Sequence, residues 1–145
     1  MTIKNIMSTN VEVVSPDALI EEVAKRMLQR DCGCILVAKD DRLVGIITDR
    51  DIAVRCVAGG KITSETTAVQ VMSPEILYCW DTDTRDAVTK NMGENRVRRL
   101  AVLDADKRLV GLVMLGDLSK HSNFPLIGET LGIICRDAAP IPRTA

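Results

Sequence analysis

The apolar positions of this 145-residue chain fall into a series of runs that occurs twice. In the first series, an extended segment at residues 11–14 leads into residues 19–28, where apolar residues recur at the spacing of a helix. Two runs rich in β-branched residues follow at 34–38 and 43–48, separated by a polar turn, and a second helical pattern begins at Ile52. The series predicts the order β-α-β-β-α, with both apolar runs forming strands that are buried on both faces.

The helical patterns also predict which side chains face the core. The first helix has a wide apolar face, made of Leu19, Ile20, Val23, Ala24, Met27 and Leu28. Ser15, Pro16 and Asp17 precede it and supply N-cap candidates and a proline suited to the first turn. The apolar face of the second helix consists of Ile52, Ala53, Cys56 and Val57.

The second series repeats the first in residue type as well as in pattern. The stretch Ile6-Met7-Ser8 recurs as Val71-Met72-Ser73, 65 residues later. The stretch Arg42-Leu43-Val44-Gly45 recurs as Arg108-Leu109-Val110-Gly111 after 66 residues, which predicts one extra residue in the turn of the second copy. Agreement in order, spacing and residue type indicates an internal duplication.

The duplication divides the chain into four parts. We expect a first repeat at 3–58, a Gly/Thr-rich linker at 59–68, a second repeat at 69–121 and a C-terminal tail at 122–145. A unit of about fifty residues buries little apolar surface by itself, so the two copies are expected to pack on one another through their sheets. The fold class is therefore α/β, with a pseudo-two-fold axis between the repeats.

Composition narrows the classes of partner. The formal net charge is −1, which gives no long-range field towards nucleic acid or an anionic membrane, and only 2% of residues are aromatic, too few for base stacking. No apolar stretch has the length of a membrane span, and the N-terminus lacks the hydrophobic region of a signal peptide. We expect a cytoplasmic protein.

The cysteines and the one histidine give no sign of catalysis. An odd count of five cysteines without a secretory signal indicates reduced thiols. Cys32-Gly33-Cys34 reads either as a metal or redox site or as small residues that open a buried strand; with no second cysteine pair, the latter is favoured. His121 has no obvious carboxylate or cysteine partner, so we predict neither an enzyme nor a metal site.

Two stretches carry a resemblance to a known family. Residues 40–51 read DDRLVGIITDRD and residues 96–102 read RVRRLAV. Each copy opens with Met-Ser and closes with a glycine and an apolar residue, followed after four further residues by an aspartate. Over residues 3–121 the chain resembles a tandem pair of cystathionine-β-synthase (CBS) domains, the Bateman module, as found in stand-alone bacterial proteins. The resemblance implies an adenosine-binding site and no obligatory cofactor.

In that family, the residues that match Thr48 and Asp51 bind the ribose. A carboxylate in the first turn of a helix can accept hydrogen bonds from both ribose hydroxyls, and the helix N-terminus favours its charged form. The resemblance adds Asp49, Arg50, Val11 and Val13 to the candidate ligand-binding residues.

The second copy matches the family less well. It keeps Asp117 but has Met114 where a hydroxyl is expected, so we predict one good site, at Thr48, and a weak or empty one at Asp117. The resemblance places Arg98 and Arg99 near ligand phosphates. The alternative for these arginines is a set of surface ion pairs with Glu94, Asp104 or Asp106.

The resemblance implies a sensor. The chain would bind AMP, ATP, NAD(H) or S-adenosylmethionine between its repeats, change their relative packing, and be read by an unidentified protein partner, with the sensor itself a homodimer. The alternative is a structural or interaction module whose clefts are vestigial.

The tail carries one further pattern. Ile127, Leu131 and Ile134 lie at i, i+4 and i+7, which predicts a short amphipathic helix. We favour a role for this helix in packing against a second subunit, the alternative being that it folds back on its own repeat.

Overall fold

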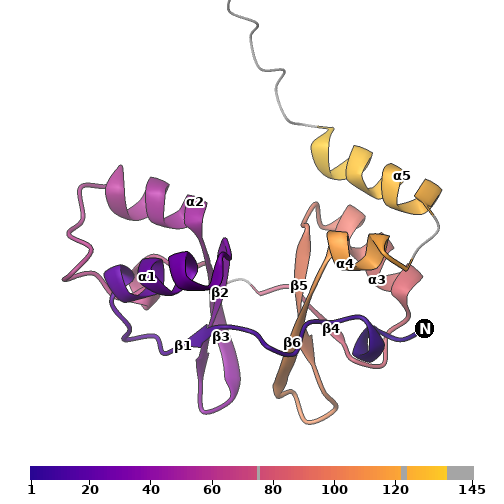
Figure 1. The fold of residues 1–145 in the computed structure, drawn as a ribbon, viewed down its shortest axis with the longest axis horizontal. Coiled ribbons are helices and arrows are strands. Elements are labelled where there is room, and N and C mark those ends of the chain that lie inside the picture. Colours follow the sequence, from indigo (N-terminus) through magenta and orange to yellow (C-terminus); the bar gives the residue numbers. More distant parts are fainter. Residues whose placement is uncertain (75, 122–123, 137–145) are drawn as a thin grey trace, which may run out of the picture.

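The computed structural model describes residues 1–74, 76–121 and 124–136 and shows two similar lobes, each a three-stranded sheet flanked by helices (Figure 1). The first lobe contains β1 (Val13–Val14), α1 (Ile20–Arg30), β2 (Cys34–Lys39), β3 (Arg42–Thr48) and α2 (Asp49–Asp51), which continues as the π-helix η2 (Ile52–Val57). The second contains β4 (Tyr78–Trp80), α3 (Arg85–Glu94), β5 (Arg99–Leu103), β6 (Leu109–Met114) and α4 (Leu115–Ser119). Two 3-10 helices, η1 (Ile3–Asn5) and η3 (Ala68–Gln70), open the repeats, and α5 (Phe124–Cys135) follows them. The predicted α/β class and the β-α-β-β-α order are confirmed.

The two sheets have the same topology and the same irregularity. In each, the first strand runs parallel to the second, and the second runs antiparallel to the third. The register shifts between Val37 and Ala38 in one sheet and between Val102 and Leu103, the equivalent positions, in the other. A shared bulge supports the duplication that the sequence indicated.

The hairpin turns differ by the predicted extra residue. The first turn is tight: Asp40 and Asp41 both have positive φ, at 52° and 60°, as a two-residue turn of type I′ requires. The second hairpin runs through a longer turn in which Lys107 has positive φ, at 60°.

The opening segment of each repeat packs in the other repeat. Ile3 is fully buried in the core of the second lobe, and its N–H donates to the carbonyl of Asp83 at 2.9 Å. Figure 1 shows this N-terminal segment beside β4 and α3, far from α1. Conversely, Ala68 and Val71 are buried in the first core. Ser8 pairs with Leu112 and Ser73 with Ile46 in matching bridges, so the lobes are tied together by exchanged segments.

This exchange explains the Met-Ser and Gly motifs of the sequence. A Cβ added to Gly111 would lie 2.7 Å from Sδ of Met7 and 2.9 Å from the carbonyl oxygen of Ser8. A Cβ on Gly45 would overlap the side chain of Met72 in the same way. Each methionine therefore needs the glycine of the opposite repeat, because only glycine leaves room for it.

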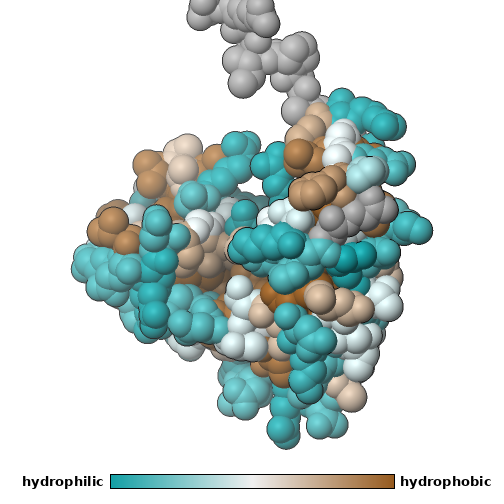
Figure 2. All heavy atoms as spheres, turned by 45° about the vertical axis from the view of Figure 1, so that its right-hand side comes forward, coloured by the Kyte–Doolittle hydropathy of each residue, from teal (hydrophilic) through white to brown (hydrophobic). Residues whose placement is uncertain are grey.

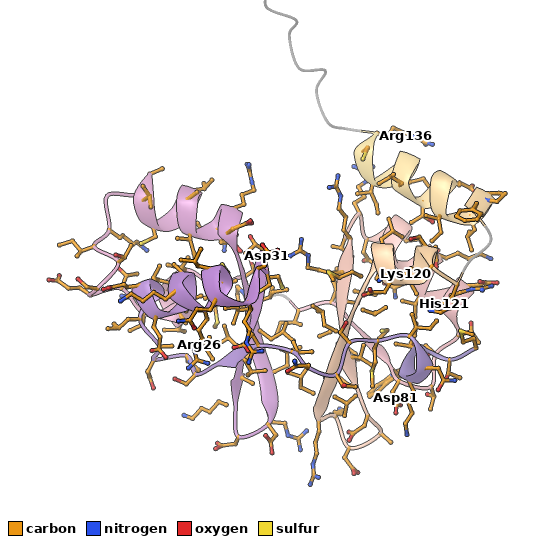
Figure 3. The ribbon with its side chains drawn as sticks, viewed as in Figure 1. Arg26, Asp31, Asp81, Lys120, His121 and Arg136 are labelled. Carbon is orange, nitrogen blue, oxygen red and sulfur yellow. The ribbon has the colours of Figure 1, made fainter. Side chains whose placement is uncertain are left out.

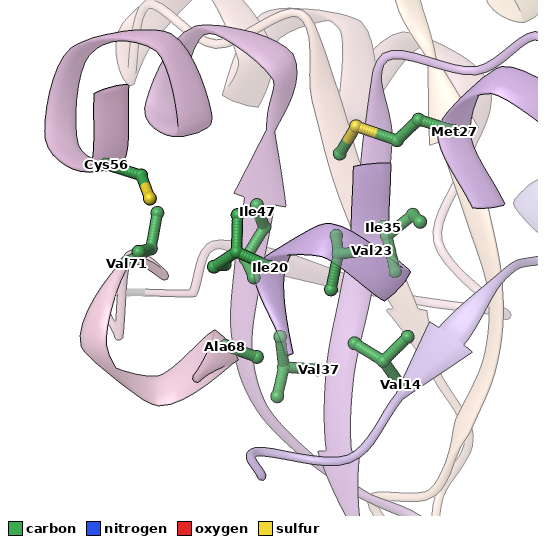
Figure 4. Close-up of a cluster of buried hydrophobic side chains, with 10 residues drawn as sticks. All are labelled: Val14, Ile20, Val23, Met27, Ile35, Val37, Ile47, Cys56, Ala68 and Val71. Carbon is green, nitrogen blue, oxygen red and sulfur yellow. The ribbon is translucent and has the colours of Figure 1, made fainter. Parts of the chain in front are cut away.

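The face that α1 buries in the first core is narrower than the sequence pattern predicted. Figure 4 shows Ile20, Val23 and Met27 of α1 packed against the sheet, with Cys56 of η2 closing one end. The prediction of a wide face was wrong for Leu19 and Leu28, which are 40% and 83% exposed. Ala24 of the same helix is exposed as well, and so are Ala53 and Val57, which were predicted for the apolar face of the second helix. A single helix lying on a three-stranded sheet touches it with one stripe only.

The start of α1 also differs from the prediction. The helix begins at Ile20, and Ser15, Pro16 and Asp17 precede its first turn. Its first N–H groups donate instead to the linker: Ile20 to the carbonyl of Thr66 at 2.9 Å, and Glu21 to that of Thr63 at 3.1 Å. Backbone carbonyls distant in sequence thus replace the side-chain cap.

The strands are buried on both faces where the lobes meet. Ile35, Leu36 and Val37 of β2 are fully buried, which confirms the prediction for this strand. In β3, Ile47 is buried but Val44 and Ile46 are half-exposed.

Helix α5 folds back on its own repeat, the alternative that the sequence left open. Ile127 and Ile134 pack against the second core, while Leu131 is 43% exposed. Thr130 is buried against α3, and its hydroxyl donates to the carbonyl of Thr89 at 3.5 Å. Residues 137–145 of the predicted tail lie outside the described residues. In the part that the structure describes, no helix combines the length and apolarity needed to cross a bilayer.

Candidate functional site

A cleft of about 520 Å³ lies between the two lobes. We call it the main cleft. Both repeats and α5 contribute to its wall, which consists of Leu36, Ile46, Thr48, Ser73, Ile76, Leu77, Arg96, Val97, Arg98, Arg99, Ala101 and Ile134. Its volume lies in the usual range for small-molecule sites, about 300–1,000 Å³. The wall is mostly apolar, with the hydroxyls of Thr48 from the first repeat and Ser73 from the second, and with three arginines that all come from the second repeat.

Thr48 occupies the point where β3 becomes α2. Its backbone N–H and its hydroxyl both donate to Oδ2 of Asp51, each at 2.9 Å, and its hydroxyl oxygen accepts the N–H of Asp51 at 3.2 Å. This reciprocal capping box fixes the strand-to-helix turn. It explains locally why a hydroxyl and a carboxylate stand three residues apart.

The second carboxylate oxygen of Asp51 faces a different partner. Oδ1 lies 3.6 Å from Nη2 of Arg55, and Nη1 of Arg55 donates to the carbonyl of Val71 at 2.9 Å and to the hydroxyl of Ser73 at 3.0 Å. Arg55 thus connects the Asp51 carboxylate to the opening segment of the second repeat, whose Ser73 lines the main cleft.

The equivalent turn of the second repeat is held more weakly. Oδ2 of Asp117 accepts the backbone N–H of Met114 at 3.1 Å, and Oδ1 lies 3.5 Å from Nζ of Lys120. Met114 has no hydroxyl to add the second hydrogen bond that Thr48 provides. Its side chain is 40% exposed.

Arg98 and Arg99 lie at the main cleft and contact thiols on either side of it. Nη2 of Arg98 lies 3.5 Å from Sγ of Cys135 on α5. Arg99 interacts with the thiol of Cys34, across the boundary between the repeats. Burial raises the pKa of the Cys34 thiol, although the hydrogen bond and the charge of Arg99 partly oppose that rise.

The structure brings together only part of the predicted site. Thr48, Arg98 and Arg99 line the main cleft, while Asp51 reaches it through its hydrogen bonds to Thr48. The other candidates are not among the described residues that line it: Asp49, Arg50, Val11, Val13 and Asp117.

Several lining residues were missed by sequence reasoning. Ile76 and Leu77 come from the segment before β4, and Ile76 is the repeat equivalent of Val11. The repeat alignment was the signal for them: the lead-in strand of one copy faces the Thr-Asp motif of the other. Ser73, Arg96 and Ile134 were not singled out as ligand-binding residues either.

A second cleft of about 430 Å³ lies beside the first, under α5. We call it the α5 cleft. It is lined by Arg98, Arg99, Met114, Leu115, Gly116, Ser119, Ile127 and Leu131. Figure 1 shows α5 lying above α4.

In the described part of the chain, the cysteines and the histidine do not gather into a metal site. Among the described residues, no group of three or more His, Cys, Asp or Glu side chains could hold an ion. All five cysteines, which lie within the described ranges, are free. His121 lies on the side of the second lobe that faces away from the first (Figure 3), and its carbonyl accepts a hydrogen bond from Arg85.

Comparison with known proteins gives a consistent result. The family model for the CBS domain matches twice, at residues 3–57 and 68–124. The CBS domain-containing protein YhcV of Bacillus subtilis is 37% identical over 118 residues, 81% of this chain and 83% of that protein. A conserved CBS domain protein of unknown function from Thermoplasma acidophilum superposes with a TM-score of 0.82 at 27% identity, over 94% of this chain and 77% of that one. The structure of CBSX2 in complex with AMP shares the fold, with a TM-score of 0.72 at 24% identity over 83% and 94% of the two chains.

Proposed function

The chain belongs to the CBS-domain family, and we propose that it is a regulatory module that binds an adenine nucleotide in the main cleft and passes the change to a protein partner. The observation that carries this proposal is the capping box of Thr48 and Asp51 at the edge of a cleft of about 520 Å³. A protein of the same fold, CBSX2, has been solved with AMP.

The capping box leaves acceptors for a ribose. A carboxylate has about four lone-pair positions, and Asp51 uses two of them, both on Oδ2, for Thr48. Oδ1 keeps capacity beside its 3.6 Å contact to Arg55, and the Asp51 side chain is 15% exposed. Hydrogen bonds from ribose hydroxyls to this oxygen, with the adenine against the apolar wall, form the binding mode we propose.

The charge of the main cleft favours phosphates. Of the described residues that line it, three are arginines and none is acidic. Guanidinium groups bind phosphate oxygens in pairs of hydrogen bonds, whereas they repel the sulfonium of S-adenosylmethionine. Among the adenosine-containing ligands of the sensor hypothesis, AMP, ATP and NAD(H) therefore fit better.

The way in which nucleotide binding would change the relative packing of the repeats follows from which residues line the main cleft. Because both repeats line the main cleft, a bound nucleotide contacts both and favours one relative packing of them. It can shift that packing only by the difference between its affinities for the two arrangements.

We also propose that two chains associate through the helices of the first repeat. Leu28 of α1 and Val54 and Val57 of η2 are 83%, 50% and 64% exposed, a large apolar exposure for neighbouring helices. Figure 2 shows brown, apolar side chains on the outer side of this lobe.

A structural module with vestigial clefts is the second candidate. Met114 favours it, since the second repeat has the same sheet topology as the first but carries this residue where the first has the hydroxyl of Thr48.

Titration calorimetry with ATP, AMP and S-adenosylmethionine separates the two candidates. We expect AMP and ATP to bind, S-adenosylmethionine to bind at least about tenfold more weakly, and Asp51→Ala to weaken AMP binding by about tenfold or more, which corresponds to the loss of one or two charge-assisted hydrogen bonds. Asp117→Ala is the matched control and should leave AMP binding within about twofold of wild type. No binding of any adenylate would favour the structural module.

A further inference from the structure

The main cleft and the α5 cleft share two residues, Arg98 and Arg99. These are the last residue before β5 and its first residue, so their side chains leave the strand edge on opposite sides. Accordingly, Arg98 contacts Cys135 on α5 while Arg99 contacts Cys34 of the first repeat. The two guanidinium groups therefore stand between the clefts and are open to both.

The two clefts differ in what they can bind. The main cleft has the hydroxyl of Thr48 and the adjoining Asp51 carboxylate, which recognise a ribose. The α5 cleft has mainly apolar walls, with Met114 and Leu131 40% and 43% exposed at its surface. In place of a ribose-binding hydroxyl it presents Met114.

The α5 cleft is better suited to a ring group that is covalently linked to the nucleotide in the main cleft than to a second, separate mononucleotide. A ring that finds few polar partners binds weakly by itself, but a covalent link to a bound nucleotide raises its local concentration at the cleft. The link would cross Arg98 and Arg99, where a diphosphate could accept paired hydrogen bonds from the guanidinium groups.

We propose that the ligand of this protein is a dinucleotide. Its adenosine occupies the main cleft at Thr48, its diphosphate lies across Arg98 and Arg99, and its second ring lies in the α5 cleft against Met114 and Leu131. This proposal rests on the nucleotide binding proposed above and adds to it a second subsite, in which α5, a helix that follows the second repeat, forms one wall.

A matched series of ligands tests the second subsite. ADP, ADP-ribose, NADH and diadenosine diphosphate all carry an adenosine and a diphosphate. ADP-ribose adds only a ribose to these, whereas the last two add a ribose with a second base, which is the ring group proposed for the α5 cleft. By titration calorimetry we expect one site per chain, with NADH or diadenosine diphosphate binding about tenfold or more tightly than ADP, and ADP-ribose close to ADP.

Variants of the α5 cleft separate the two subsites. Leu131→Asp places a charge on its apolar wall and should weaken the binding of the tighter dinucleotide by about tenfold, while ADP binding stays within about twofold. Gly116→Leu is a second variant: a Cβ at Gly116 meets nothing within 4 Å, so a larger side chain has room there, occupies part of the cleft and should have the same selective effect. Phe124→Asp on α5 is the control, because Phe124 is 77% exposed and is not among the residues that line either cleft.

The outcomes distinguish this inference from the function on which it rests. If ADP binds but neither dinucleotide binds more tightly, or if Leu131→Asp and Gly116→Leu leave dinucleotide binding unchanged, the second subsite is refuted and nucleotide binding stands. Two equivalents of AMP bound per chain would likewise overturn the dinucleotide and leave two mononucleotide sites. If none of the four ligands binds, both proposals fail.

Discussion

The carboxylate of Asp51 accepts two hydrogen bonds from Thr48 at 2.9 Å, one from the backbone N–H and one from the hydroxyl. The same two residues start a helix and border the main cleft. A motif that is read as a ligand signature therefore also has a structural role. In the second repeat, which lacks the hydroxyl, the residue at the position of Thr48 gives the aspartate one hydrogen bond in place of two, from the N–H of Met114 to Asp117.

Restoring the missing hydroxyl should stabilise the second repeat. Met114→Thr supplies an N-cap to α4 and is expected to raise the free energy of unfolding by about 0.5–1.5 kcal/mol, because Met114 is 40% exposed and little packing is lost. Urea denaturation of this variant and of the control Met114→Ser, which also caps the helix, checks the effect. An unchanged or lower stability in both variants would show that the cap is not what the second turn lacks.

The two glycines that face methionines should differ in their tolerance of alanine. At Gly111 the added Cβ would lie 2.9 Å from the carbonyl oxygen of Ser8, which is held by a hydrogen bond from Leu112 N–H at 3.0 Å. At Gly45 the nearest atoms belong to the flexible side chain of Met72. We expect Gly111→Ala to cost about 2–3 kcal/mol and Gly45→Ala about 1 kcal/mol, measured by urea denaturation. The reverse order would refute the exchange of opening segments as the reason for the glycines.

Stability should decline at alkaline pH through Cys79. Burial, and secondly the charge of Asp83, raise the pKa of this thiol from 9.0 to about 12. The folded protein thus holds the proton more tightly than the unfolded chain, so the contribution is complete below pH 9 and is lost as the pH rises towards 12. Each pH unit in this window should cost up to about 1.4 kcal/mol.

The test compares slopes of unfolding free energy between pH 9 and 11. Cys79→Ala should lose some stability at pH 7 yet show a shallower decline than wild type, whereas Cys135→Ala, which removes an exposed thiol, should decline like wild type. Parallel slopes for wild type and Cys79→Ala would contradict the assignment.

Charges on the helices of the first repeat should prevent association. Leu28→Glu and Val57→Glu together place two acids on the exposed apolar surface of α1 and η2 and leave the buried residues untouched. Sedimentation velocity should show a dimer for wild type and a monomer for the double variant. Phe124→Glu on α5 is the control and should stay dimeric; a monomeric wild type would contradict the proposal.

The sequence predicted what depends on local pattern and on the duplication. The strand pair 34–38 and 43–48, the longer turn of the second copy and the helix after the repeats all follow from residues close together in the chain, and the structure has each of them. The exposed face of α1 was mispredicted because periodicity shows which residues are apolar, not how wide a surface covers them. Leu28, 83% exposed, is the clearest case.

The rest depends on contacts between distant segments. The N–H of Ile20 is capped by the carbonyl of Thr66, and Ile3 is buried in the opposite lobe, neither of which a local pattern can show. For the same reason the cleft at Thr48 is completed by Ile76 and Leu77 of the other copy, rather than by Val11 and Val13.

The central claim is that one nucleotide site exists per chain and that Thr48 is part of it. Titration calorimetry of AMP into wild type, Thr48→Val and Thr48→Ser tests it most directly, because Val keeps the shape of the side chain and removes its hydroxyl while Ser keeps the hydroxyl. We predict one AMP per chain for wild type, an affinity reduced by about tenfold in Thr48→Val, and an affinity within about threefold of wild type in Thr48→Ser. Equal affinities for wild type and Thr48→Val, or no AMP binding to wild type at all, would contradict the account.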